Sequence, residues 1–211
     1  MKRWNREQIA RRAAQDIRPG AYVNLGIGLP TQVGDMIPPE REVFLHSENG
    51  ILHLGPRPPA GQENPELINA SKQPVTLRPG AAIFDSALSF AMMRGGHLDL
   101  AILGAYEVAE NGDLANWSRG DPATPPAVGG AMELAFGARE VWVLMEHTTR
   151  DGRPRLLHRC SLPLTARGVV RRIYTDLAVM SVTPDGLRVE AMAEGLTLAG
   201  LQALTEARLV S

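Results

Sequence analysis

The sequence is poor in the residues that would support several common kinds of site. Cys160 is the only cysteine among 211 residues, which excludes an intrachain disulfide framework and a multi-cysteine metal site. No apolar run approaches the roughly 18 residues of a transmembrane helix, and no secretory signal follows the basic N-terminus. We therefore expect a soluble, cytoplasmic protein with no membrane partner.

An excess of charge of one sign is also lacking. The chain carries 22 basic and 23 acidic side chains, for a formal net charge of −1, which argues against a general binder of nucleic acid or of anionic membranes. The histidines are scattered, with no pair at metal-site spacing on a predicted helix, so we expect no metal site. There are five of them: His46, His53, His97, His147 and His158.

Hydrophobic patterning predicts strands that alternate with short helices. Asn5 is a good N-cap for a first helix, and Thr31 is predicted to cap a short helix that runs toward Met36. Further helices are predicted over 86–94, 131–136 and 197–204, strands over 21–25, 43–47, 81–84, 100–103, 141–145, 177–182 and 187–193, and hairpins around Asn111-Gly112 and Asp185-Gly186. This order predicts one α/β domain over residues 1–211, with a single open mixed sheet and flanking helices.

A Gly-x-Gly pattern follows the first predicted strand, at Gly26 and Gly28. The third glycine of a dinucleotide-binding fingerprint would fall at position 31, where the chain has Thr31, so a nicotinamide enzyme is not indicated. Two glycines at a strand end instead indicate a close approach of the backbone, either to packing or to a ligand.

The segment Ser47-Glu48-Asn49-Gly50 places a carboxylate where a buried strand ends. In open α/β sheets, binding sites are built at such strand ends. Asn49-Gly50 predicts a tight turn that projects Glu48 outward, and the Asn49 amide could orient an acyl oxygen. Taken alone, the spacing is also typical of a hairpin turn preceded by a solvated glutamate.

Lysine is rare in a chain that uses arginine almost everywhere. There are 20 arginines but only two lysines, Lys2 and Lys72. An ammonium group is compact and strongly hydrated, whereas a guanidinium is planar. A lysine within the Ile68–Lys72 segment therefore suggests a position that requires the smaller cation, although chance accounts for it equally well.

With these residues assembled, the chain resembles the B (β) subunit of the class I 3-oxoacid CoA-transferases. The resemblance runs from about Ile9 to Val210, with several specific motifs in the right order. These motifs are Val23-Asn24-Leu25-Gly26-Ile27-Gly28, Leu45-His46-Ser47-Glu48-Asn49-Gly50-Ile51, Ile68-Asn69-Ala70, Arg94-Gly95-Gly96-His97, Gly112-Asp113-Leu114-Ala115-Asn116-Trp117 and Gly129-Gly130-Ala131-Met132. The fold that the resemblance implies is the CoA-transferase (NagB/RpiA-like) type.

The resemblance implies that Glu48 is a covalent nucleophile. A carboxylate is already ionised at neutral pH, so unlike a serine it needs no general base. In such enzymes it attacks an acyl-CoA, forms a glutamyl-CoA thioester, and passes the CoA to a second carboxylate. The thioester activation is retained throughout, so we expect no permanently bound cofactor and no metal, with a coenzyme A thioester as substrate.

The resemblance also implies roles for the residues around the nucleophile. Asn49 and Lys72 would orient the oxyanion or the substrate. Two positions depart from the family pattern, because His53 and Ser71 stand where glycine is usual. CoA binding would fall to Asn24, Gly26, Gly28, Gly129 and Gly130.

The expected substrate and partner also follow from the resemblance. The Pro-rich loop over 118–128 and the stretch Arg172–Leu177 are similar to β subunits that act on 3-oxoadipate, and Arg119 is a candidate cation for a distal carboxylate. The partner would be a CoA-transferase A (α) subunit in an α2β2 assembly, with succinyl-CoA as donor. The alternatives are an acetoacetate-specific enzyme, an acyl-CoA hydrolase and a CoA-binding module without catalytic activity.

Overall fold

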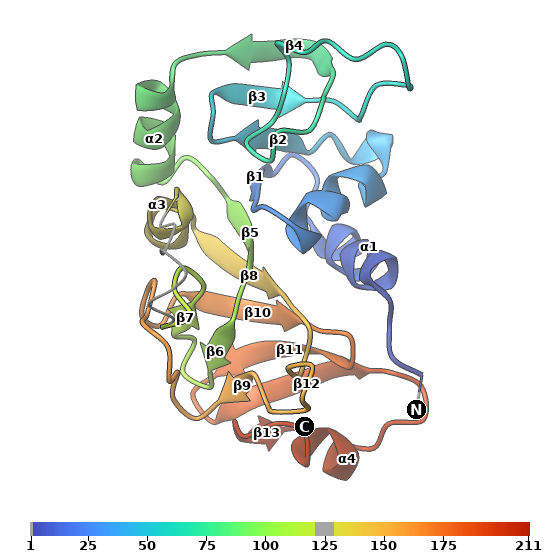
Figure 1. The fold of residues 1–211 in the computed structure, drawn as a ribbon, viewed down its shortest axis with the longest axis vertical. Coiled ribbons are helices and arrows are strands. Elements are labelled where there is room, and N and C mark those ends of the chain that lie inside the picture. Colours follow the sequence, from blue (N-terminus) through green and yellow to red (C-terminus); the bar gives the residue numbers. More distant parts are fainter. Residues whose placement is uncertain (1, 121–128) are drawn as a thin grey trace.

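The computed structural model describes residues 2–120 and 129–211 and contains a large mixed β-sheet (Figure 1). The parallel order β10-β8-β5-β1-β2 forms its centre, and antiparallel pairs follow on both sides, with β13 parallel to β12 at one edge. This arrangement confirms the predicted open mixed α/β sheet. From one edge to the other, the strands are β13 (Leu209–Val210), β12 (Gly186–Met192), β11 (Ala178–Thr183), β10 (Val170–Tyr174), β8 (Glu140–Leu144), β5 (Leu100–Gly104), β1 (Tyr22–Leu25), β2 (Phe44–Ser47), β3 (Ile51–Leu54) and β4 (Leu77–Ile83).

A small second sheet corrects the prediction of a single sheet. The predicted hairpin around Asn111-Gly112 is present as antiparallel β6 (Glu107–Ala109) and β7 (Leu114–Ala115). A third strand, β9 (Leu156–Leu157), pairs with β6 in parallel. This two-residue strand lies far from β6 in sequence, and no local pattern marks it.

Helices cover both faces of the large sheet. The α-helices are α1 (Arg6–Asp16), α2 (Ser86–Arg94), α3 (Ala131–Gly137) and α4 (Leu198–Gln202), with 3₁₀ helices η1 (Leu29–Met36) and η2 (Pro39–Arg41). Alternate residues of the central strands enter two separate cores. On β5, Ile102 packs in the core that contains α1, whereas Leu103 packs in the core that contains residues of α2 and α3.

Local capping signals are confirmed at one helix and wrong at another. Asn5 and Gln8 form a reciprocal capping box at the start of α1. Thr31 does not cap the next helix, because the N-cap is Gly28, which has a φ of 93° and no side-chain hydrogen bond. The Thr31 hydroxyl instead donates to the Gly26 carbonyl at 3.0 Å, which ties η1 to the end of β1.

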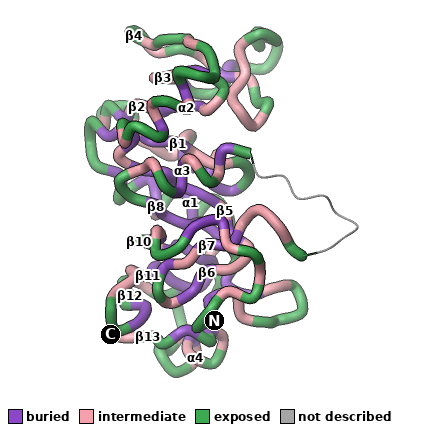
Figure 2. The backbone as a smooth tube through the Cα atoms, turned by 90° about the vertical axis from the view of Figure 1, so that its left-hand side faces the viewer, coloured by how far each residue is buried: buried purple, intermediate pink, exposed green. Residues whose placement is uncertain are grey.

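Four strands are absent from the sequence prediction: β3, β9, β10 and β13. Strand β3 follows the 48–50 turn directly and is distorted at His53, whose φ of 62° coincides with a shift in register against β4. At the sheet edge, β4 is largely exposed, whereas the central strands are buried (Figure 2). In the described part of the chain, no helix has both the length and the hydropathy of a membrane span.

Candidate active site

Glu48 lies in the turn between β2 and β3, as the sequence predicts. The Gly50 amide donates to the Ser47 carbonyl at 2.9 Å, and Gly50 has a φ of 109°. A side chain at Gly50 would overlap the Phe84 carbonyl, while the Phe84 amide donates to the Gly50 carbonyl at 2.9 Å. The turn therefore requires glycine both for its backbone conformation and for its close packing on the segment before α2.

The Glu48 carboxyl group points toward the start of α3. A Cβ built on Gly130 would overlap Glu48 Oε2 and lie 3.1 Å from Glu48 Cδ. The same Cβ would lie 3.6 Å from Cζ of Phe90, on α2. The half-buried carboxyl group thus lies close to the backbone of Gly130 and near an aromatic ring.

This environment raises the pKa of Glu48. The main cause is burial, which disfavours the charged carboxylate, and the negative charge of Glu133 adds to the effect. Glu133 is itself paired with Arg94 at 3.1 Å, so its field on Glu48 is partly compensated. A carboxylate with reduced solvation is a stronger nucleophile than one in bulk water, which suits attack on an acyl group.

Asn24 lies inside the protein, behind the turn. It is 2% exposed and stands opposite His46 in the pairing of β1 with β2. Its Nδ2 lies 2.9 Å from His46 Nδ1 and 3.3 Å from the His46 carbonyl oxygen. The side chain predicted to contact CoA thus has its Nδ2 group engaged within the protein.

Asn49 lies in the turn before β3, and Lys72 lies in the loop between β3 and β4. Neither contacts Glu48 through a hydrogen bond or ion pair within the described residues. The side-chain Nδ2 group of Asn49 donates to the Ile68 carbonyl oxygen at 2.7 Å and so holds this loop next to the turn. Lys72 is exposed and has a φ of 60°, with its own amide bonded to the Asn69 carbonyl at 2.9 Å. The left-handed residue of this turn is therefore Lys72 and not the neighbouring Ser71.

The glycines of the predicted site fall into two kinds. Gly26 is a packing position, because its amide donates to the Ile102 carbonyl at 2.8 Å and an added Cβ would lie 3.1 Å from that oxygen. Gly28 and Gly129 have positive φ angles, and a Cβ added at either would meet no atom of the described residues within 4 Å, which leaves their backbone available to a ligand. Among these predicted glycines, Gly130 is the one that approaches the Glu48 carboxyl group.

Comparison with known proteins identifies the family. The model of the coenzyme A transferase family matches residues 6–201. The chain belongs to the coenzyme A transferase family. It is 54% identical over 205 residues to the B subunit of 3-oxoadipate CoA-transferase from Acinetobacter baylyi, covering 97% of this chain and 94% of the relative. It is 48% identical over 202 residues to the B subunit of succinyl-CoA:3-ketoacid coenzyme A transferase from Helicobacter pylori, covering 96% and 97%.

Solved structures support the fold of this CoA-transferase chain. The thioester complex of an acyl-CoA transferase from Escherichia coli O157:H7 matches with a TM-score of 0.74 at 20% identity. The match covers all of this chain but only 42% of the other, so the chain spans about two fifths of that longer protein. Glutaconate coenzyme A-transferase from Acidaminococcus fermentans matches with a TM-score of 0.70 at 16% identity, covering 99% of this chain and 86% of the other.

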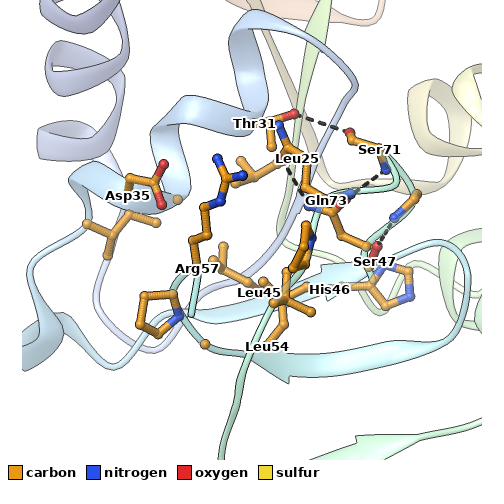
Figure 3. Close-up of a pocket in the computed structure, with 18 of the residues that line it drawn as sticks. Leu25, Thr31, Asp35, Leu45, His46, Ser47, Leu54, Arg57, Ser71 and Gln73 are labelled. Atoms are coloured by element: carbon orange, nitrogen blue, oxygen red, sulfur yellow. Dashed lines mark hydrogen bonds between the residues drawn. The ribbon is translucent and has the colours of Figure 1, made fainter. Parts of the chain in front are cut away.

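A cavity of about 300 Å³ lies beside β2 and the loop that follows β3 (Figure 3). Its walls include Leu25 and Leu45, which pack with the core that contains α1, whereas Phe90 beside Glu48 packs with the core of α2 and α3. Ser47 lines the cavity and accepts a hydrogen bond from the Ala70 amide at 2.9 Å. The cavity thus borders β2, and Glu48 is not among the residues that line it.

Sequence reasoning misses the side chains that the fold brings together near the 48–50 turn. From the sequence, His46 is only one of five scattered histidines, and nothing local marks Ser89 or Phe90 on α2. The alternation of β2 is the available signal, because it puts His46 on the strand face opposite to Leu45. Within residues 2–120 and 129–211, no group of three metal-ligating side chains comes together.

Proposed function

We propose that this chain is the B subunit of a CoA-transferase that moves CoA from succinyl-CoA to 3-oxoadipate through a glutamyl-CoA thioester on Glu48. The observation that carries the proposal is the placement of the Glu48 carboxyl group. It stands at the end of a parallel strand, half-buried, against the bare backbone of Gly130. The names of the relatives from Acinetobacter baylyi and Helicobacter pylori supply the substrate class.

The proposed reaction proceeds in two halves. The Glu48 carboxylate attacks the thioester carbonyl of succinyl-CoA, and the CoA thiolate leaves to give a mixed anhydride. The thiolate then attacks the Glu48 γ-carbonyl and releases succinate, which leaves a glutamyl-CoA thioester. In the second half, the carboxylate of 3-oxoadipate attacks this thioester and expels the CoA thiolate, which gives a second mixed anhydride. The thiolate then attacks the 3-oxoacyl carbonyl of that anhydride and releases the Glu48 carboxylate. No metal and no permanently bound cofactor take part.

The residues around Glu48 have proposed roles in this reaction. Gly28 and Gly129 allow the chain to approach CoA, whereas Gly26 packs against Ile102. Asn49 orients the substrate by holding the loop at Ile68 against the turn. Lys72, on its exposed turn, is available to a carboxylate or phosphate of the ligand.

We propose that an A subunit completes the site, in an α2β2 assembly located in the cytoplasm. Large apolar side chains are exposed on the elements near Glu48: Leu88 on α2, Met132 and Phe136 on α3, and Ile83 on the edge strand β4. Ile83 and Phe136 are each 66% exposed, which is unusual for such residues in an isolated domain. A second polypeptide on this face would bury them and exclude water from the anhydride.

Selection of a dicarboxylate is assigned to Arg119. Its guanidinium lies over the Tyr106 ring, 4.7 Å from the ring centroid, so the cation is held by stacking. The rest of the Pro-rich loop that suggests 3-oxoadipate, at 121–128, lies outside the described residues. An acetoacetate-type acceptor is the alternative, and the name of the Helicobacter pylori relative specifies only a 3-ketoacid.

The test is the intact mass of the chain, co-expressed with its A subunit and mixed with succinyl-CoA. We expect a hydroxylamine-sensitive CoA adduct that is absent in Glu48→Ala, and its discharge by 3-oxoadipate faster than by acetoacetate. Faster discharge by acetoacetate would move the assignment to that acceptor. Release of free CoA without an acceptor would indicate a hydrolase, and ligand binding with no adduct would indicate a CoA-binding module.

A further inference from the structure

Three buried polar side chains form a continuous series of hydrogen bonds behind the turn over residues 48–50. Asn24 on β1 contacts His46 on β2, and His46 Nε2 lies 3.1 Å from Ser89 Oγ on α2. Asn24 and His46 are each 2% exposed and Ser89 is fully buried. We infer that His46 is a positioning residue for Glu48: it joins β2 to α2 and so fixes the nucleophile against Gly130. This inference rests on the proposed function of Glu48.

The contacts determine the protonation of His46. The His46 carbonyl oxygen can only accept a hydrogen bond, so Asn24 must present its Nδ2 group to it. The same Nδ2 group faces His46 Nδ1, which must then be the acceptor and carry no proton. The proton therefore resides on Nε2 and is donated to Ser89 Oγ. Burial lowers the pKa of His46 to about 4, so the neutral ring persists at neutral pH.

His46 is connected to both sides of the Glu48 environment. It lies two residues before Glu48, and its partner Ser89 is adjacent to Phe90, which packs close to Gly130. The Phe84 ring stacks on His46, with centroids 6.2 Å apart and planes at 20°. The Phe84 amide in turn binds the Gly50 carbonyl at the far end of the same turn.

An apolar side chain at position 46 would fill the same space at less cost in desolvation. Burying three polar side chains is unfavourable unless each is hydrogen-bonded, and their directional contacts allow only one placement of α2 against β2. The hydrogen bonds of Asn24, His46 and Ser89 therefore fix the position of α2 relative to β2, and catalysis requires such positions to be held within a fraction of an ångström.

A second buried histidine in the same chain provides a matched control. His147 Nδ1 lies 2.9 Å from Thr175 Oγ1, its Nε2 lies 2.8 Å from Thr205 Oγ1, and burial lowers its pKa to about 4. Its partners follow β10 and α4, in the half of the molecule away from the 48–50 turn (Figure 1). Changes at His147 should therefore disturb folding to a similar degree without acting on Glu48.

The experiment compares His46→Phe and His46→Gln with His147→Phe in the complex with the A subunit. His46→Phe keeps the ring but removes both hydrogen bonds, and we expect kcat to fall about 100-fold with KM for succinyl-CoA within twofold. Glutamine retains one donor and one acceptor, so His46→Gln should restore most of kcat. His147→Phe should lower the melting temperature comparably and leave kcat unchanged.

A second readout does not depend on turnover. Carbodiimide labels exposed carboxyl groups, and peptide mass mapping of Glu48 should show faster labelling in His46→Phe than in the wild type or in His147→Phe. Equal labelling rates, unchanged kcat in His46→Phe, or an equal loss of kcat in His147→Phe would each overturn the inference. If the wild-type complex forms no Glu48 adduct, the proposed function fails, and the labelling rates still decide whether His46 positions this side chain.

Discussion

Substitution of Gly130 by alanine should move the Glu48 carboxyl group while leaving the carboxyl group itself unchanged, so it tests the effect of position alone. The backbone of Gly130, with φ −83° and ψ 6°, is accessible to alanine, so the change introduces no conformational strain. The new methyl group would overlap Glu48 Oε2 and lie 3.1 Å from Cδ, inside ordinary contact distance. Because Phe90 is also close by, at 3.6 Å from the same Cβ, the carboxyl group must shift by on the order of 1 Å.

A displacement of that size from a reactive geometry lowers a rate about 100-fold, which corresponds to about 2.7 kcal/mol in activation free energy. The assay is the rate of CoA adduct formation by intact mass, with succinyl-CoA and the assembled complex. Gly200→Ala on α4 is the control, because an added Cβ there meets only side-chain atoms, at 3.2 and 3.3 Å. Wild-type rates in Gly130→Ala, or an equal loss in the control, would refute the proximity argument.

Three further predictions concern charge and capping. Because the pKa of Glu48 is raised in the folded protein, its ionised form destabilises the fold at neutral pH, and this penalty disappears as the pH falls through the folded pKa. Glu48→Gln should therefore have a higher melting temperature than the wild type at pH 7, and the difference in melting temperature should close toward pH 4. Glu133→Gln removes a charge that raises this pKa, so the acid limb of the activity profile should move to lower pH, and a limb that stays in place would contradict the assignment. Asn5→Ala breaks the capping box of α1 and should lower stability by about 1 kcal/mol, seen as a fall of roughly 2–4 °C in melting temperature with activity retained.

Much of the architecture is encoded locally. The capping box at Asn5, the hairpins at Asn111-Gly112 and Asp185-Gly186, and the helix after Gly130 each depend on residues a few positions apart, so the sequence predicts them correctly. The same holds for the turn that presents Glu48, because Gly50 supplies the backbone conformation that other residues rarely adopt.

Local patterns fail where other contacts, at short or long range in the sequence, decide the structure. Thr31 has the chemistry of an N-cap, but its hydroxyl is engaged by the Gly26 carbonyl, and the helix begins earlier. Strand β9 exists only because two residues meet β6 across the fold. Neither the Thr31 hydrogen bond nor the pairing of β9 with β6 produces a periodic pattern of apolar residues in the sequence around it.

The position of Glu48 at the end of a buried strand is thus readable in the sequence, and its environment is not. The approach of Gly130 to Glu48 joins residues 82 positions apart, and the hydrogen bond of His46 with Ser89 joins residues separated by 43. Both contacts depend on how α2 and α3 pack on the sheet, which is set by burial of the whole apolar core. The sequence alone determined that the Glu48 carboxylate follows a buried strand and precedes a tight turn, and the tertiary structure decided its solvation, its neighbours and the direction in which it points.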